Sequence, residues 1–488
     1  MATKRKANLL EVGSEDYEPN KKIKIHNSYR NGGYVYTRPL TSTTMHGPWY
    51  FELSSASNVY TDPRTLQLLG AISVYEINDS GGRTHVDAVS PVVTKLDTED
   101  GQPDQFESSD NVLNKLSVIN NLPHSAIDTI RVRIGDNNSI SVHEFYWLRS
   151  YIETLLSTSK NTKDFTLHAR GFFMESGNHM QSRTTDNPGF DHRQKIFLYG
   201  ERVDFIIPLH IDLATLQGHL KPGLSIKLEI ERKSSEFCLL EDSGVSAEIK
   251  KRKFEVVFED LQLRAMQYTL IKGLEDKVNE LGQEWNTPFT RVEIRDFTVL
   301  NGETQIIKPN FWNGNGQLPE QVIIVMTEED SIGDKRDKNP FQLEDRNIRN
   351  AYLTKLGPDG KDIPFTPVDI DGKFGQIVAY DEFLKAIGIS EWEDTDIGIT
   401  KEDYFKGYFM MAWDLTKDRC ARAHFHTPEY GQMGLRIQLG AGGTNKTYHV
   451  FVYSVYNEIL NIDRENNVSN ALYTKELDLN NITTTSTS

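Results

Sequence analysis

The chain has 488 residues, of which 38% are hydrophobic and 25% charged, a composition typical of folded domains and not of a disordered chain. Its 54 Lys and Arg against 70 Asp and Glu give a net charge of -16, which excludes a protein that wraps nucleic acid over its whole surface. Only Cys238 and Cys420 are present, so we expect no disulfide framework. No stretch approaches the ~18 consecutive apolar residues of a membrane helix, so we expect no membrane span.

The N-terminal segment, residues 1–46, is predicted to be a flexible arm with local positive charge. Its two basic clusters consist of Lys4, Arg5 and Lys6 and of Lys21, Lys22 and Lys24. Two clusters at this separation resemble a bipartite nuclear import signal, and the same charges can contact DNA phosphates by nonspecific attraction. A solvated arm without any partner stays open as a third interpretation.

Residues 47–265 are predicted to form a first β-sandwich, because short strands dominate this part of the chain. From Leu224 to Ile230 every second side chain is apolar, and this period of two is typical of a half-buried antiparallel strand. Similar runs occupy residues 49–53, 130–134, 254–258, 292–299, 322–326, 435–439 and 448–456. Since turns rich in Gly, Pro, Asn and Asp separate them, the pattern predicts an all-β sandwich or barrel.

Three helices are predicted among the strands. Residues 145–156 and 380–387 each place apolar side chains on one face at spacings of three and four. Residues 266–286 show the same spacing, stop before Pro288, and are predicted to be a linker helix between two domains. Residues 287–465 then form a second sandwich, and the polar residues 466–488 form a flexible C-terminal tail.

A faint internal repeat relates the two predicted sandwiches. Each half contains a strand followed by a glycine-led hairpin turn, then an apolar strand closed by aspartate, and then an alternating strand preceded by glycine. The corresponding residues are Ile134 and Leu356, Asp212 and Asp414, and Leu224 and Leu435. Because the order is the same and each offset is close to one domain length, we expect the same strand order in both halves. Two unrelated β-domains are the alternative.

No motif in the sequence supports catalysis, so we expect no enzyme, no catalytic residue and no cofactor. His424 and His426 lie near Cys420 and Glu429, but a zinc site needs more ligands than the sequence visibly offers there. We therefore interpret this segment as a polar surface loop and expect no metal site. A Gly-x-Ser-x-Gly elbow is absent from the sequence as well.

Several segments distributed between residues 47 and 468 resemble one known family. They are residues 122–130, 146–156, 291–298, 317–325, 339–341, 398–404 with 407–408, and 457–464. Together they are similar to the major capsid protein of Polinton (Maverick) elements and of the related adintoviruses. None of these segments is a catalytic signature, so the resemblance implies a shared architecture more than a site.

The resemblance implies an all-β chain with two tandem eight-stranded jelly rolls, a double jelly roll. It also implies a homotrimer that forms pseudo-hexameric capsomers of an icosahedral capsid around double-stranded DNA. The implied partners are neighbouring capsomers, a penton or minor capsid protein and, through the N-terminal arm, packaged DNA. The implied location is the virion and, during assembly, the host nucleus or cytoplasm. The resemblance implies no cofactor.

Two alternatives stay open. A penton or minor capsid protein usually has one jelly roll, and the internal repeat disfavours it. A jelly-roll carbohydrate-binding protein or glycan-processing enzyme would bind sugars through exposed aromatic side chains, for which Trp312, Trp392 and Tyr430 are the candidates. The sequence shows no identifiable carboxylate pair for glycan hydrolysis.

Overall fold

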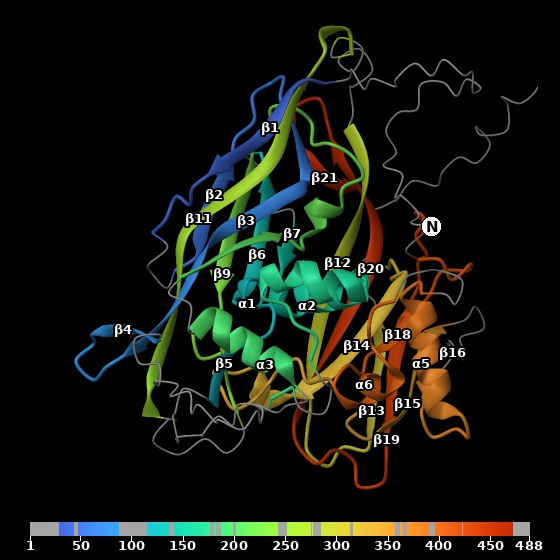
Figure 1. The fold of residues 1–488 in the computed structure, drawn as a ribbon. Coiled ribbons are helices and arrows are strands. Elements are labelled where there is room, and N and C mark those ends of the chain that lie inside the picture. Colours follow the sequence, from blue (N-terminus) through green and yellow to red (C-terminus); the bar gives the residue numbers. More distant parts are fainter. Residues whose placement is uncertain are drawn as a thin grey trace, which may run out of the picture.

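The computed structural model describes most of the chain. The described residues are 29–42, 47–86, 115–135, 141–175, 180–181, 187–198, 202–242, 251–274, 276, 285–312, 316–356, 362–364, 368–389, 396–421 and 423–471. Antiparallel strands dominate them, with several short helices between the strands (Figure 1). The expected all-β class is therefore confirmed.

The first half of the chain forms two sheets. One sheet has the order β1 (Tyr29–Thr37), β11 (Lys253–Leu270), β3 (Tyr60–Ile77) and β8 (Val203–Pro208), and β4 (Arg83–His85) pairs with the end of β3. The other sheet has the order β2 (Trp49–Leu53), β9 (Ile226–Arg232), β6 (Ile127–Ile134) and β7 (Ser141–His143). A separate pair consists of β5 (Leu116–Val118) and β10 (Leu239–Glu241).

The second half of the chain also forms two sheets. One has the order β12 (Trp285–Val299), β20 (Tyr448–Ile462), β14 (Gln321–Glu328) and β18 (Met411–Asp414), and β21 (Val468–Ala471) pairs with β20. The other has the order β13 (Gln305–Trp312), β19 (Met433–Leu439), β15 (Ile348–Leu356) and β16 (Asp362–Pro364), and β17 (Val368–Asp369) pairs with β15.

The two halves have the same strand order, which is that of a jelly roll. When the short strands β4, β5, β10, β17 and β21 are left out, eight strands remain in each half, and numbered along the chain they read 1-8-3-6 in one sheet and 2-7-4-5 in the other, in both halves. The predicted hairpins are the fourth and fifth strands, β6–β7 and β15–β16, and the predicted alternating strands are the seventh, β9 and β19. The expectation of equal strand order is confirmed, and two β-domains of different topology are excluded.

Helices fill the connection between the fifth and sixth strands of each half. The helices with described bounds are α1 (Leu122–Ser125), α2 (Tyr146–Ser157), η3 (Thr162–Thr166), η4 (Leu167–Arg170), α3 (Pro188–Arg193), η5 (Gln194–Leu198), η6 (Asp212–Thr215), η8 (Glu329–Ser331), α5 (Gly375–Ala386) and α6 (Lys401–Lys406), and residues 272–274 and 276 are helical as well. The helices predicted over residues 145–156 and 380–387 correspond to α2 and α5. Both predictions are confirmed.

The linker helix predicted over residues 266–286 is wrong over its first part. Strand β11 continues to Leu270 and pairs with β1 on one side and with β3 on the other. Met266 and Leu270 are four residues apart, and this even spacing satisfies the period of a strand as well as that of a helix. Because β11 is hydrogen-bonded to a strand on each side, this segment is a strand and not a helix. At the other end Trp285 already belongs to β12.

The N-terminal arm predicted over residues 1–46 includes a strand. Residues Tyr29–Thr37 form β1, which pairs with β11 at the edge of the first sheet. Residues 1–28 and 43–46 lie outside the described residues. The flexible arm predicted over residues 1–46 is therefore wrong over Tyr29–Thr37. The flexible tail predicted over residues 466–488 is likewise wrong over Val468–Ala471, because these residues pair with β20 as β21.

One tryptophan on the second strand of each jelly roll fills the space between the two sheets of that roll. Trp49 on β2 is fully buried and contacts Phe258 on β11, with ring centroids 5.2 Å apart. Trp312 on β13 is 2% exposed, and its Nε1 donates to Ser454 Oγ on β20 at 3.0 Å. Each tryptophan thus connects the second strand of its roll to the eighth. Most buried apolar residues of both rolls form one continuous core, and Tyr60, Tyr268 and Leu270 form a smaller cluster apart from it.

Candidate functional site

The six basic residues predicted for nuclear import or DNA contact lie outside the described residues. They are Lys4, Arg5, Lys6, Lys21, Lys22 and Lys24. Their role stays a prediction.

The aromatic residues predicted as sugar contacts do not form one exposed surface. Trp312 is part of the core, as described above, so its predicted exposure in a loop is wrong. Tyr430 is 44% exposed. Trp392 lies outside the described residues. Among the described residues, only Tyr430 of the three can stack on a sugar.

The two jelly rolls meet along a buried polar interface that includes Arg149. Arg149 lies on α2, its side chain is 2% exposed, and its Nη1 donates to Asp212 Oδ1 at 2.7 Å. The same oxygen accepts a hydrogen bond from the backbone N–H of Val292 on β12, at 3.1 Å. Since Asp212 follows β8 in the first roll and Val292 belongs to the second, this carboxylate joins the two rolls directly.

Glu153 lies one turn after Arg149 on α2 and also contacts both rolls. Its Oε1 accepts hydrogen bonds from Arg149 Nε at 2.7 Å and from the hydroxyl of Tyr453 on β20 at 3.0 Å. Its Oε2 lies 2.7 Å from Nδ1 of His210. Burial raises the pKa of Glu153, but Arg149 and His210 outweigh burial and hold this pKa well below its ordinary value. Glu153 is therefore a carboxylate at neutral pH.

Backbone groups extend this interface along β12. The backbone N–H of Thr290 donates to Thr215 Oγ1 at 2.8 Å, and that hydroxyl donates to the Thr290 carbonyl at 2.9 Å. The backbone N–H of Gln217 donates to the Pro288 carbonyl at 2.8 Å. The connection after β8 thus docks against the first strand of the second roll, which fixes how the two rolls sit together.

A second contact between the rolls contains a fully buried ion pair. Arg193 Nη2 donates to Glu175 Oε1 at 2.7 Å, and neither side chain is exposed. The backbone N–H of Glu175 donates to the Tyr408 hydroxyl at 3.0 Å, and that hydroxyl donates to the Glu175 carbonyl at 2.8 Å. Nearby, the rings of Tyr151 and Phe341 stack with centroids 3.9 Å apart. Polar and apolar contacts thus join the two rolls here as well.

A cavity of about 440 Å³ lies beside the interface and has walls from both rolls. Glu153 and Thr215 line it from the first roll, and Thr290, Tyr453 and His424 line it from the second. Two of its charged groups, Glu153 and Arg149, already pair with each other. We therefore regard it as a polar space between the rolls.

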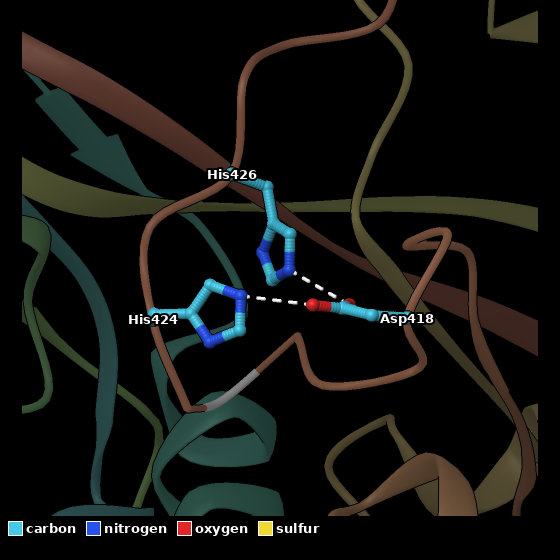
Figure 2. Close-up of side chains that lie close together, drawn as sticks. All are labelled: Asp418, His424 and His426. Atoms are coloured by element: carbon cyan, nitrogen blue, oxygen red, sulfur yellow. Dashed lines mark hydrogen bonds and ion pairs between the residues drawn. The ribbon is translucent and has the colours of Figure 1, made fainter.

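The connection between β18 and β19 gathers Asp418, His424 and His426 on the second roll (Figure 2). His424 Nε2 lies 2.9 Å from Asp418 Oδ2, and His426 Nε2 lies 2.9 Å from Asp418 Oδ1. The two imidazole rings face the same carboxylate, with centroids 4.3 Å apart. On the far side of its ring, His426 Nδ1 lies 3.5 Å from Oε2 of Glu320.

Two carboxyl groups of this cluster have shifted pKa values. Burial raises the pKa of Asp418, but hydrogen bonds from His426 and from the Cys420 backbone N–H outweigh it and bring this pKa to about 2. Burial raises the pKa of Glu320 to about 7, against the opposing effects of His426 and Asn457. The cluster thus combines an anionic carboxylate with two imidazoles.

The sequence pointed to the two histidines but not to the residue that joins them. Glu429 follows the two histidines closely in the sequence but points elsewhere: it forms ion pairs with Lys355 at 2.7 Å and with Lys417 at 3.1 Å. The exposed Cys420 donates its thiol to the Asp418 carbonyl. The third group is Asp418, which no regular spacing marks, because the segment is an irregular loop.

No helix in the described part of the chain is long and apolar enough to span a bilayer.

No protein-family model matches the chain. An uncharacterized protein of Caenorhabditis elegans is 20% identical over 425 residues, which cover 86% of this chain and 91% of that protein.

Several solved structures of viral capsid chains have a similar fold. A chain of the Sputnik virophage has a TM-score of 0.60 at 12% identity, and the match covers 96% of this chain and 94% of that one. The mavirus major capsid protein has a TM-score of 0.53 at 11% identity, and the match covers 96% of this chain and 99% of that one. The PBCV-1 virus capsid has a TM-score of 0.52 at 9% identity, over 93% of this chain and 99% of that one. The fold of the chain is a double jelly roll, shared with viral major capsid proteins along nearly its whole length.

Proposed function

We propose that the chain is a structural protein, the major capsid subunit of a DNA virus or virus-like element of the Polinton or adintovirus type. One observation carries the proposal: two jelly rolls of identical strand order are joined in one chain by a buried interface. The likeness to capsid chains over nearly the whole length supports the same role. The proposed role is structural and requires no catalysis.

The proposed assembly is a homotrimer. Two similar lobes per chain, repeated around a three-fold axis, give six lobes at nearly equal angles, which tile a hexagonal lattice. A heterologous interface that closes around a cyclic axis leaves no free end. Such pseudo-hexameric capsomers would build an icosahedral shell around double-stranded DNA. The interface at Arg149 and Glu153 supports this assembly, because it fixes the angle between the two lobes within each chain.

The proposed partners are neighbouring capsomers, a penton or minor capsid protein, and packaged DNA through the basic clusters of residues 1–28. The proposed location is the virion, with assembly in the host nucleus or cytoplasm. The charge supports a local role for the arm, because the whole chain carries a net charge of -16 and only short segments can attract DNA.

Light scattering of the purified full chain at low micromolar concentration tests the assembly. A stable species of three times the chain's mass is the expected result, and negative-stain images should show particles with six lobes. A strict monomer over the whole concentration range contradicts the capsomer. A glycan-binding screen of the same sample separates the carbohydrate alternative: a monomer that retains one class of glycan would replace the capsid proposal.

A further inference from the structure

We propose that Asp418, His424 and His426 form a binding site for one divalent transition-metal ion of the class of Zn²⁺. This proposal departs from the expectation of no metal site, because folding supplies a third ligand, Asp418, and an outer partner, Glu320. The ion would have a structural role, since it would fix the connection between β18 and β19 against the start of β14. The proposal does not depend on whether the chain assembles into capsomers.

The donor atoms already converge. The three ligand atoms lie within 4.8 Å of one another, and both imidazoles present Nε2 to the same carboxylate (Figure 2). Zn²⁺ binds imidazole nitrogen and carboxylate oxygen at about 2.0–2.2 Å, so neighbouring ligand atoms in a tetrahedral site lie about 3.3–3.5 Å apart. Small side-chain rotations therefore suffice to admit an ion. The mixed nitrogen and oxygen donors suit Zn²⁺ better than Mg²⁺ or Ca²⁺, which prefer oxygen ligands.

The carboxyl group of Glu320 lies beside the ring nitrogen of His426 that does not face Asp418. His426 presents Nε2 to Asp418 and Nδ1 to Glu320 Oε2, at 3.5 Å. Glu320 is itself held by Asn457 on β20, whose Nδ2 donates to Oε2 at 2.7 Å. A carboxylate on the second ring nitrogen fixes the tautomer and orientation of a ligating histidine and raises its basicity. An ordinary surface ion pair does not require this second carboxylate.

The loop that carries the ligands is ordered by its own hydrogen bonds. Asp414, the last residue of β18, accepts from the backbone N–H of Thr416 at 2.9 Å and of Ala421 at 2.9 Å. The backbone N–H of Cys420 donates to Asp418 Oδ1 at 3.1 Å. Because the backbone around the first ligand is already folded, binding an ion costs little ordering entropy.

Solvent reaches two of the three ligands. The side chains of Asp418 and His424 are 45% and 56% exposed, whereas that of His426 is 17% exposed. An ion can therefore enter from solvent, and a water molecule can take the fourth position. His426 and Glu320 would anchor the ion on the inner side of the loop.

Zinc titration of the tag-free full chain by calorimetry tests the site. The parent protein for all measurements is Cys420→Ser, because the exposed thiol next to the ligands could bind Zn²⁺ itself. We expect one equivalent of Zn²⁺ to bind the parent and its affinity to fall at least 100-fold in His424→Ala/His426→Ala. The variant His168→Ala/His192→Ala removes two imidazoles elsewhere on the first roll and should bind as the parent does. Glu320→Gln should weaken binding about 10- to 100-fold, as outer-shell changes do.

Co²⁺ spectra and proteolysis supply readouts that a nonspecific surface site would not give. Bound Co²⁺ should show the intense visible absorption of a tetrahedral site in the parent and lose it in Asp418→Asn. Zn²⁺ should slow trypsin cleavage after Lys417 and Arg419 in the parent, because the ion fixes this loop, and should leave the rate unchanged in the double histidine variant. No Zn²⁺ binding by the parent, or unchanged affinity in the double histidine variant, would overturn the proposal.

Discussion

Tyr453, on the last strand of the second jelly roll, donates a hydrogen bond to Glu153 in the first, 300 residues earlier in the chain. The carboxylate that accepts it is also held by Arg149 and His210, so four side chains from three segments of the chain meet at one point. This contact therefore helps to fix the angle between the two rolls within each chain.

The variant Tyr453→Phe should lower the free energy of unfolding by about 1–3 kcal/mol, because it removes a hydrogen bond to a charged acceptor. Urea titration of the purified protein measures the change. Tyr50→Phe is the matched control, since the Tyr50 hydroxyl donates to Glu229 at 3.4 Å on an exposed surface within one roll. An equal loss of unfolding free energy in the two variants would contradict the expectation that the hydrogen bond between the rolls stabilises the protein more than the surface one.

The variant Arg193→Met should cost about 3–5 kcal/mol, because it leaves the carboxylate of Glu175 buried without its cation. Adding Glu175→Gln should recover part of this loss, since the double variant buries no net charge. Thermal unfolding midpoints of the three proteins give the comparison. Arg349→Met, which breaks an ion pair with side chains 44% and 56% exposed, is the control and should change little. If the losses of stability in the two single variants simply add in the double variant, the cost of Arg193→Met does not come from the unpaired carboxylate of Glu175.

Lys163 should make the stability of the protein rise with pH above neutrality. Its side chain is fully buried and donates to the carbonyls of Leu155 and Ile397, and burial lowers its pKa to about 7. An unfolded lysine titrates near 10.4, so between about pH 7 and 10 the unfolded chain binds more protons than the folded one and stability increases with pH.

Lys163→Met should lack this increase. The difference in unfolding midpoint between the parent and Lys163→Met should therefore grow in favour of the parent from pH 7 to pH 9. Lys160→Met, which replaces a side chain that is 58% exposed, should follow the parent at every pH. Parallel curves for the parent and Lys163→Met would show that Lys163 keeps an ordinary pKa.

Alanine replacement of the basic clusters tests the arm. A reporter fused to residues 1–28 should enter the nucleus, and replacing Lys4, Arg5, Lys6, Lys21, Lys22 and Lys24 together should leave it in the cytoplasm. Replacing an equal number of polar uncharged residues in the arm is the control. Nuclear entry of the alanine variant would contradict the import signal and leave DNA contact or a solvated arm without a partner as the interpretations of these charges.

Local patterns in the sequence predict the strands and the repeat well, because burial of one sheet face imposes a period of two. The alternating residues from Leu224 to Ile230 lie in and just before β9, and the repeated hairpins lie at equivalent places. Met266 shows the limit of such patterns, since its spacing to Leu270 fits both a strand and a helix. Only the pairing of β11 with two neighbours settles the choice.

Contacts between distant residues could not be predicted from local pattern. Glu320 and Asn457 are 137 residues apart, yet their hydrogen bond places the carboxylate beside His426. Trp312 follows a polar stretch and precedes glycine and asparagine, which suggested a loop, but the roll closes over it. In both cases the sheets, and not the neighbouring residues, determine the environment of the side chain.

Two rolls encoded in one chain can specialise separately. A substitution in one roll leaves its counterpart unaltered, whereas a chain with a single roll would carry every change into every lobe of any particle it forms. The connection after the sixth strand illustrates the result. In the first roll it presents Thr215 to the neighbouring roll, and in the second it brings His424 and His426 together at one carboxylate, that of Asp418. One of these two connections can therefore change in sequence while the other keeps its contacts.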